Sequence, residues 1–406
     1  MTTAVQAPPT TLRVQVLQEN LHRALAALNP AIAKRPKLLI LANVRIATVR
    51  GRLVLTATDL HQVISVTVGA KVECEGAVTV PYAALAAHVK ALPPVTIALT
   101  ETESASVTRG NRTIPGRLEI LGGRNETSFP TWAAEDYPRI APADGPPILF
   151  AQRFAEALAY VLPCVSRDDG HPVLAGVSLQ WDGAAITLAA ADGYRLAVRT
   201  VPAYDVPRPA VEPYSMIIPL AGAAAMARCA RGQGCELRRS DEGLHYSAVP
   251  RSDFGTGDRH ADLRYGGVLI QGTFPDFGKI IPTDPACTVT VNRAELTRSV
   301  KGAVPVVKDG SGWVRLTWTA DALTVSARAD EAGNYSAYSA EIDASVAYTR
   351  ESSSNIAFNY RYLLDALAAL PGETVSIGTD SPTAAALFTS PGHDGCYVIM
   401  PGQIQW

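Results

Sequence analysis

One short stretch gathers the residue types that metal-dependent hydrolases use. Within residues 253–262 the chain carries Asp253, Asp258, His260 and Asp262. Carboxylates and imidazole bind divalent metals and transfer protons, so a metal-dependent hydrolase acting through this stretch is one hypothesis. The spacing matches no familiar metal-ligand motif, however, and the interleaved glycines are typical of an exposed loop. We therefore predict no catalytic residue, no metal site and no cofactor.

Basic residues are the second candidate for chemistry, because they can bind phosphates. They lie on or beside stretches with helical periodicity: Arg23, Lys34, Arg35, Lys37, Lys90, Arg153, Arg167, Arg228, Arg231, Arg293, Arg298, Lys301 and Arg361. Acidic residues on the same stretches are fewer, chiefly Glu19, Glu156, Glu295 and Asp365. The whole chain has 36 Lys and Arg against 38 Asp and Glu, so a positive surface must be local. For each single residue, an ordinary solvated helix face is the alternative.

A positive surface of this kind attracts phosphates without reading bases. Binding would then be independent of nucleotide sequence and would weaken steeply as salt rises. Only 7% of the residues are aromatic, and arginine does not alternate with aromatic residues as it does in proteins that bind single strands. The composition therefore favours backbone contact over base recognition.

The elements that must position these residues recur along the chain. Leu188–Val198 reads as two apolar strands separated by Asp192-Gly193, which predicts a tight hairpin with positive φ at both turn residues. Asp59 lies 192 − 59 = 133 residues earlier in a similar stretch. The helical pattern of Asn20–Leu28 returns at Arg153–Val161 with the same shift, 154 − 21 = 133. A shared phase of helix and strand predicts a repeated unit.

A third, approximate copy begins near Leu296 and continues with strands predicted at Val314–Trp318 and Ala322–Ala327. Each copy then has a strand end followed by a helix, at Thr79–Leu92, Ile217–Ala230 and Ala357–Leu370. Pairs of alternating strands follow, predicted as Val95–Leu99 with Ala105–Arg109 and as Thr374–Gly378 with Ala384–Thr389. Two helices and antiparallel strands in each copy predict an α+β fold. Proline-rich segments suggest a flexible tail at 1–11 and domains at 12–146, 147–283 and 284–406.

Cysteine usage and apolar runs bear on the compartment. The six cysteines are Cys74, Cys164, Cys229, Cys235, Cys287 and Cys396, and no two form a C-x-x-C pair. This spacing favours reduced, semi-buried side chains over a zinc or redox site. No apolar run approaches the roughly 18 residues of a membrane span, and the first residues lack the pattern of a signal peptide. We therefore predict a cytoplasmic protein with no membrane partner.

An ordered set of short motifs resembles a known family. The motifs are Leu39-Ile-Leu-Ala-Asn-Val44, Ala191-Asp-Gly-Tyr-Arg-Leu-Ala197, Phe274-Pro-Asp-Phe277, Ile356-Ala-Phe-Asn-Tyr-Arg-Tyr-Leu-Leu-Asp365 and Tyr397-Val-Ile-Met-Pro401. Together they are similar to the β subunit of bacterial DNA polymerase III, the sliding clamp, from about Thr11 to Pro401. The resemblance implies three tandem clamp domains and a head-to-tail homodimer that closes as a ring around duplex DNA. Helices would line the channel and sheets would form the outside.

The resemblance also implies what the protein does and what it binds. It would be an accessory subunit rather than an enzyme, and it would bind duplex DNA, the DNA polymerase III catalytic subunit, the clamp loader and other clamp-binding proteins. His171 joins the basic residues as a DNA-facing position only through this resemblance. A β-rich interaction scaffold that does not encircle DNA, and the hydrolase described above, are the alternatives.

Partner proteins of the family dock short Leu- and Phe-containing peptides in an apolar cleft between the second and third domains. The matching positions are Leu174, Ala191, Gly193, Tyr194, Arg195, Leu196, Pro275, Lys279, Ile280, Asn359, Tyr362, Val398, Ile399, Met400 and Pro401. An apolar cleft with few polar groups suits a short anchor peptide, although core packing is the alternative for Leu174, Leu196 and Val398. Gly402 and Gln403 stand where the family often has a large apolar and a basic residue. We therefore expect a cleft with an altered peptide preference.

Overall fold

The computed structural model describes residues 12–103, 107–109, 112–114, 116–139, 143, 145, 148–150, 153–168, 170–202, 212–229, 234–240, 243, 245–251, 261–308, 311–331 and 334–404. These residues form two compact units. Unit 1 comprises Met1–Ala155 and Ala225–Leu269, and unit 2 comprises Glu156–Ala224 and Ile270–Trp406. The predicted tail 1–11 and most of the 253–262 stretch lie outside the described residues.

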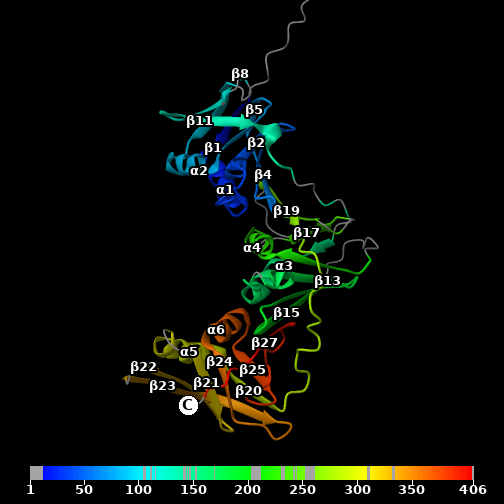
Figure 1. Ribbon diagram of the computed structural model, residues 1–406, viewed down its shortest axis with the longest axis vertical. Coiled ribbons are helices and arrows are strands. Elements are labelled where there is room, and N and C mark those ends of the chain that lie inside the picture. The colour runs from blue at the N-terminus through cyan, green and yellow to red at the C-terminus, as the bar shows by residue number, and fades with distance from the viewer. Residues whose placement is uncertain are drawn as a thin grey trace, which may run out of the picture. The chain divides into compact units, whose positions relative to one another are not determined.

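Unit 1 is built on a 13-stranded antiparallel sheet (Figure 1). Its strand order is β12 (Ile148–Phe150), β17 (Gly234–Arg239), β18 (His245–Arg251), β19 (Ala261–Val268), β4 (Gln62–Val68), β3 (Arg52–Thr58), β2 (Asn43–Val49), β6 (Ala77–Pro81), β11 (Asn125–Ala133), β10 (Gly116–Gly122), β7 (Thr96–Glu103), β1 (Arg13–Leu17) and β5 (Lys71–Cys74). A separate ribbon pairs β8 (Val107–Arg109) with β9 (Arg112–Ile114). Helices α1 (Gln18–Leu28) and α2 (Tyr82–Ala91) contact each other, and α1 packs on β3 and β4.

Unit 2 contains a 12-stranded antiparallel sheet. Its order is β16 (Tyr214–Pro219), β13 (Gly176–Trp181), β14 (Ala185–Ala191), β15 (Arg195–Pro202), β27 (Gly395–Ile399), β26 (Ala386–Thr389), β25 (Thr374–Thr379), β20 (Cys287–Asn292), β23 (Asn334–Tyr348), β22 (Ala322–Glu331), β21 (Trp313–Trp318) and β24 (Asn355–Asn359). Helix α5 (Arg293–Val307) packs on β22 and β23 and contacts α6 (Tyr360–Ala369). Helices α3 (Arg153–Val161) and α4 (Leu220–Cys229) each contain a point at which the chain passes from one unit to the other, after Ala155 and after Ala224.

The helices bury the faces that the sequence periodicity predicts. Leu21, Ala24, Leu25 and Leu28 of α1 are almost fully buried, and the corresponding apolar residues of α3 and α5 are buried as well. Apolar positions three and four apart lie on one side of a helix, so burying that side on a sheet stabilises the helix through packing. The predicted α+β architecture is therefore confirmed.

The 133-residue shift between the first two copies is visible in the backbone. The short 3₁₀ helix at Leu39–Ala42 precedes β2 at Asn43, and the one at Pro172–Leu174 precedes β13 at Gly176, so both pairs of starting positions differ by 133 (172 − 39 and 176 − 43). The hairpin turns match too. Asp59 Oδ1 accepts hydrogen bonds from the backbone N–H two and three residues later, at 2.9 and 2.8 Å, and Asp192 Oδ1 does the same at 3.0 and 3.0 Å.

The last strand of each copy also ends in the same way. Trp132, at the end of β11, pairs with Thr79 in the strand before α2. Ile270, which follows β19, pairs with Ile217 in the strand before α4. In the third copy Gly402 N–H donates to the Ala357 carbonyl, in the strand before α6, at 2.9 Å. β11, β19 and β27 are therefore equivalent strands.

Two local predictions were wrong. Among the described turn residues of the Asp192 hairpin only Gly193 has a positive φ, 88°, because the Asp192 carboxylate caps the turn and a second left-handed residue is not needed. Val95–Leu99 does not pair with Ala105–Arg109. Instead β7 pairs with β1 and β10, whereas β8 pairs with β9. By contrast β25 pairs with β26 as predicted.

The repeat creates a position at which the first copy is strained. Leu60 has φ 77° and is equivalent to Gly193 with φ 88° (193 − 60 = 133). A left-handed backbone costs an L-residue roughly 1–2 kcal/mol, and glycine recovers part of this despite its greater freedom in the unfolded chain. Leu60→Gly is expected to raise the free energy of unfolding by about 0.5–1 kcal/mol, and Gly193→Leu to lower it by about 1 kcal/mol. Urea midpoints of the full chain measure both, and a Leu60→Gly variant less stable than the parent would contradict the assignment.

Two further findings concern the predicted compartment. Within the described part of the chain, no helix has the length and apolar character needed to cross a membrane. Cys164 and Cys287 are buried free thiols, whereas Cys74 and Cys396 are partly buried and also free. Burial raises the pKa of the Cys164 thiol to about 12, so it is an unreactive packing residue.

Candidate nucleic-acid interface and docking surface

The exposed faces of the helices carry mainly cations and small side chains. Exposed cations on the described helix residues are Arg23 (α1), Lys90 (α2), Arg153 (α3), Arg228 (α4), Arg298 and Lys301 (α5) and Arg361 (α6), and the exposed acids are Glu19 and Glu156. Every other exposed position on these helices is Ala, Gly or Pro: Ala26, Ala83, Ala84, Ala87, Ala91, Ala159, Ala221, Ala294, Gly302, Pro305 and Ala368. At the described exposed positions such a surface attracts phosphates and has no neutral polar side chain to read a base edge, and the partly exposed Asn20 accepts from Arg23 at 2.6 Å.

The remaining predicted cations lie in loops. Lys34, Arg35 and Lys37 are exposed before β2, and Arg167 is exposed at the equivalent place before β13 (167 − 34 = 133). Arg231 lies outside the described residues. Arg293 of α5, by contrast, is only partly exposed, and its Nε and Nη1 donate to the Gly372 and Leu367 carbonyls at 2.7 and 3.1 Å. The other described predicted cations are open to solvent, and their contact with DNA stays a prediction.

His171 occupies the same loop as Arg167. Its Nδ1 lies 3.1 Å from Asp168 Oδ2, and both side chains are exposed. The Gly170 N–H and the His171 side chain hold the pKa of Asp168 below its ordinary value. A phosphate contact by His171 would therefore compete with Asp168.

Four of the predicted docking residues belong to or pack against one apolar cluster in unit 2. Its buried members are Ala189, Leu196, Val198, Ile217, Phe274 and Val398. Leu174 and Ala191 pack against it while remaining partly exposed. The cluster forms because β15 pairs with β27, which sets Leu196 opposite Val398. Residues far apart in sequence thereby share one sheet face.

Strand alternation separates the predicted residues into two groups. Val398 belongs to the cluster, but Ile399 does not and is fully buried. Because successive side chains on a strand point to opposite faces, Ile399 packs on the other side of the sheet and is a core residue. Leu196 and Val398 are 3% and 2% exposed, so they form the buried layer beneath the exposed residues of the apolar cluster.

The exposed apolar residues form the rim. Tyr194, Ile280 and Met400 are 65%, 48% and 41% exposed. Met400 N–H donates to the Tyr194 carbonyl at 2.8 Å, which holds these two side chains at one edge of the cluster. Exposed large apolar residues beside an apolar floor are the usual mark of a binding surface.

Several members of this surface were not singled out from the sequence. Val173, Ile270, Phe277, Ile281 and Leu387 also pack against the cluster. The Phe274 and Phe277 rings contact edge to face, with centroids 6.3 Å apart. The Phe274-Pro-Asp-Phe277 motif was a signal for the two phenylalanines, whereas the packing of the other residues depends on pairings between distant strands.

Arg195, a predicted docking residue, bridges three parts of unit 2. Its Nε donates to Asp192 at 2.9 Å, Nη1 donates to Asp365 of α6 at 2.6 Å, and Nη2 donates to the Pro163 carbonyl. The guanidinium also lies over the Tyr362 ring, 4.4 Å from its centroid. Burial disfavours its charge, but the two carboxylates outweigh burial and the pKa of Arg195 is raised. Arg195 thus links the Asp192 turn to the start of α6.

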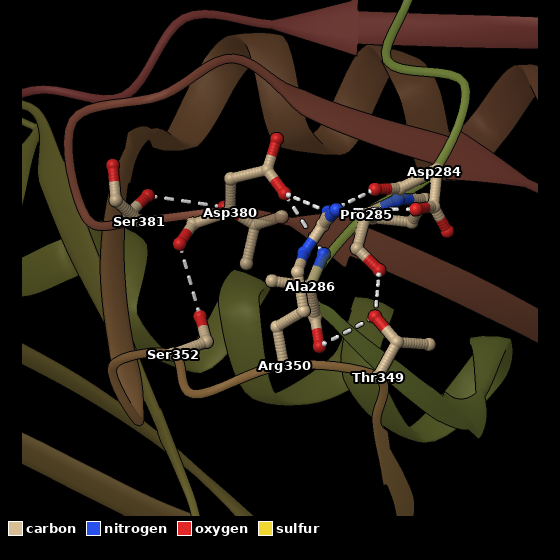
Figure 2. Close-up of polar contacts among 9 residues, drawn as sticks. Asp284, Pro285, Ala286, Thr349, Arg350, Ser352, Asp380 and Ser381 are labelled. Carbon is tan, nitrogen blue, oxygen red and sulfur yellow. Dashed lines mark hydrogen bonds and ion pairs between the residues drawn. The ribbon is translucent and has the colours of Figure 1, made fainter.

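The segment that carries Pro275, Lys279 and Ile280 is held at its far end by a polar network (Figure 2). Arg350 Nη1 and Nη2 donate to Asp284 and Asp380, each at 3.2 Å. Asp380 Oδ1 also accepts from Ala286 N–H at 2.8 Å, so one carboxylate joins the segment to β25 and its neighbours. Lys279 itself is exposed and pairs with Asp276 at 3.3 Å.

Comparison with known families decides the assignment. Three sequence models of the DNA polymerase III β subunit match the chain in order: the N-terminal domain over residues 12–141, the central domain over 149–245 and the C-terminal domain over 278–403. The chain belongs to the DNA polymerase III β subunit family. This confirms the resemblance on which the sequence analysis drew.

Relatives of the β subunit family match nearly the whole chain. The beta sliding clamp of Rickettsia bellii is 25% identical over 97% of this chain and 100% of its own length. That of Synechococcus elongatus is 28% identical over 96% and 98%. The solved C. crescentus beta sliding clamp superposes with a TM-score of 0.84 at 22% identity, covering 98% of this chain and 100% of that one. A sliding clamp from Pseudomonas aeruginosa, solved with griselimycin bound, gives 0.81 at 22%, covering 97% and 100%.

Proposed function

We propose that this protein is a DNA sliding clamp, a homodimeric ring that encircles duplex DNA and tethers a DNA polymerase to it. The observation that carries the proposal is the set of exposed helix positions, which hold cations and otherwise Ala, Gly or Pro apart from two acids. A ring that slides must attract the backbone without reading or gripping bases. The role is accessory, and the comparisons give no support to the hydrolase alternative.

Repeated strand pairings support closure into a ring. The fourth strand of the first copy, β4, pairs with the last strand of the second, β19. The fourth strand of the second copy, β15, pairs with the last strand of the third, β27. By the same rule β23, in the third copy, would pair with β11 in the first copy of another chain. Within the described residues, 334–343 of β23 pair only with β22, and 125–131 of β11 pair only with β10. Open edges of this kind are templates for pairing between chains.

The domain limits 12–146, 147–283 and 284–406 remain part of this proposal. So does the binding of duplex DNA by the exposed cations, with no dependence on sequence. The clamp would work in the cytoplasm with the catalytic polymerase subunit and a clamp loader as partners.

We further propose that partner peptides dock on the apolar cluster of unit 2 beside Tyr194, Ile280 and Met400. The Pseudomonas aeruginosa clamp was solved with griselimycin bound, which makes griselimycin a suitable probe. Few unpaired charges lie at this surface, since Arg195 is bonded to Asp192 and Asp365 and Lys279 to Asp276. An apolar anchor therefore fits it better than a charged one.

A docking variant tests this placement. The double substitution Met400→Ala, Pro401→Ala is expected to weaken binding of a labelled peptide from the organism's own polymerase at least tenfold, because it removes an exposed anchor contact. Fluorescence anisotropy measures the change. Val49→Ala removes another exposed apolar side chain, 49% exposed in unit 1, and is expected to leave affinity unchanged. Full affinity in the double variant would refute the placement.

A further inference from the structure

The chain after Met400 is fixed across the edge of the third copy. Gly402 N–H donates to the Ala357 carbonyl of β24 at 2.9 Å, and Arg315 Nη2 of β21 donates to the Ile404 carbonyl at 3.4 Å. The side chain at position 402 would therefore be held in a defined place, two residues from the exposed Met400. Position 402 is thus part of the same rim.

Trp313 fills the space that a side chain at 402 would need. A Cβ built on Gly402 would lie 2.4 Å from both Cη2 and Cζ3 of the Trp313 indole and 2.7 Å from its Cε3. Gly402 does not have a positive φ, so glycine is required here by space and not by backbone conformation. The bulk at this edge is therefore supplied by the first residue of β21 instead of by the chain's last residues.

Trp313 lies beside the start of α6. Trp313 is partly exposed and lies opposite Asn359 in the β21–β24 pairing. Asn359 caps α6 by accepting from Arg361 N–H at 3.0 Å, and this cap precedes Tyr362, over which the Arg195 guanidinium is stacked.

We propose that Trp313, seated on Gly402, forms an aromatic subsite beside Met400 and sets the peptide preference of this clamp. The subsite takes an aromatic side chain of a docking peptide, because the Trp313 indole and the Met400 thioether contact aromatic rings favourably. The inference rests on the proposed docking function and names the residue that determines its specificity.

Two synthetic hexapeptides test the inference by fluorescence anisotropy, one carrying Leu-Phe and the other Leu-Ala at the same positions. The parent protein should bind the Phe peptide at least tenfold more tightly than the Ala peptide. Trp313→Ala should remove most of this preference while changing the affinity for the Ala peptide less than twofold. Trp313→Phe, which keeps an aromatic ring, should retain the preference within threefold.

A second variant acts from the other side of the contact. Gly402→Met should displace the indole and lower the affinity for the Phe peptide, and Trp313→Ala combined with Gly402→Met should restore part of it, because the added side chain refills the vacated space. If Trp313→Ala weakens both peptides equally, or neither, the subsite is refuted and the docking surface stands. If the parent binds neither peptide nor griselimycin, the docking function itself is refuted.

Discussion

Replacing Arg195 with alanine is expected to destabilise unit 2 by about 3 kcal/mol, the typical cost of removing one partner from a buried ion pair. The Arg195 side chain is 11% exposed and satisfies two carboxylates and the Pro163 carbonyl. Alanine would leave Asp192, which is 15% exposed, without its cation and would remove the group stacked on Tyr362. The link between the Asp192 turn and α6 would be lost.

Urea unfolding of the full chain measures this effect, and matched variants locate its cause. Arg195→Lys should recover only part of the loss, since a single ammonium cannot reach Asp192, Asp365 and the Pro163 carbonyl together. Arg361→Ala removes an exposed cation on α6, the helix that carries Asp365, and should cost little because Arg361 bonds only to the neighbouring Tyr360 hydroxyl among the contacts described. Equal stability of Arg195→Ala and Arg361→Ala would contradict the bridging role.

Ser339→Pro is expected to weaken the dimer at least about 30-fold. Ala344 N–H donates to the Asp321 carbonyl and Val346 N–H to the Ala320 carbonyl, both on the β22 side of β23. N–H groups alternate along a strand, so those of odd-numbered residues such as Ser339 point to the open edge. Proline at 339 removes one of these donors but spares the β22 ladder.

The size of this effect follows from symmetry. Each unsatisfied backbone partner costs about 1–3 kcal/mol, and a ring of two chains contains the contact twice. The dimer dissociation constant should therefore rise at least about 30-fold, which corresponds to about 2 kcal/mol. Analytical ultracentrifugation measures it. Ser339→Ala should remain dimeric, and Ala340→Pro should instead lower folding stability, because its N–H faces β22. A Ser339→Pro variant with the same dimer dissociation constant as Ser339→Ala would exclude β23 from the interface.

The repeat was predictable from sequence because its signals are local. The spacing of apolar residues in a helix, their alternation in a strand and the turns at Asp59 and Asp192 all depend on neighbours within a few residues. The 133-residue shift predicted from these signals is therefore also found in the structure. The residue with positive φ in the turn shows that prediction from local sequence has a limit. In the second copy the glycine at position 193 indicates a residue with positive φ. In the first copy Leu60 adopts the same conformation, although leucine gives no indication of it in the sequence.

Pairings between distant strands could not be predicted. The position of β1 between β5 and β7, and the partner of Val95–Leu99, depend on which edges meet in three dimensions. The docking surface was only partly predictable for the same reason. Ile399 was assigned to it and is buried on the opposite sheet face, and Trp313 was missed because its contact with Gly402 needs β24 and the last residues in place.

Retention on circular DNA tests the central proposal most directly. The protein is assembled with its clamp loader on a nicked circular plasmid, and bound and free protein are separated by gel filtration at a salt concentration that abolishes simple electrostatic binding. The ring proposal predicts that the protein stays on the circle and is released when one restriction cut makes the plasmid linear. Equal retention before and after the cut, or a monomer retained on neither form, would contradict encirclement.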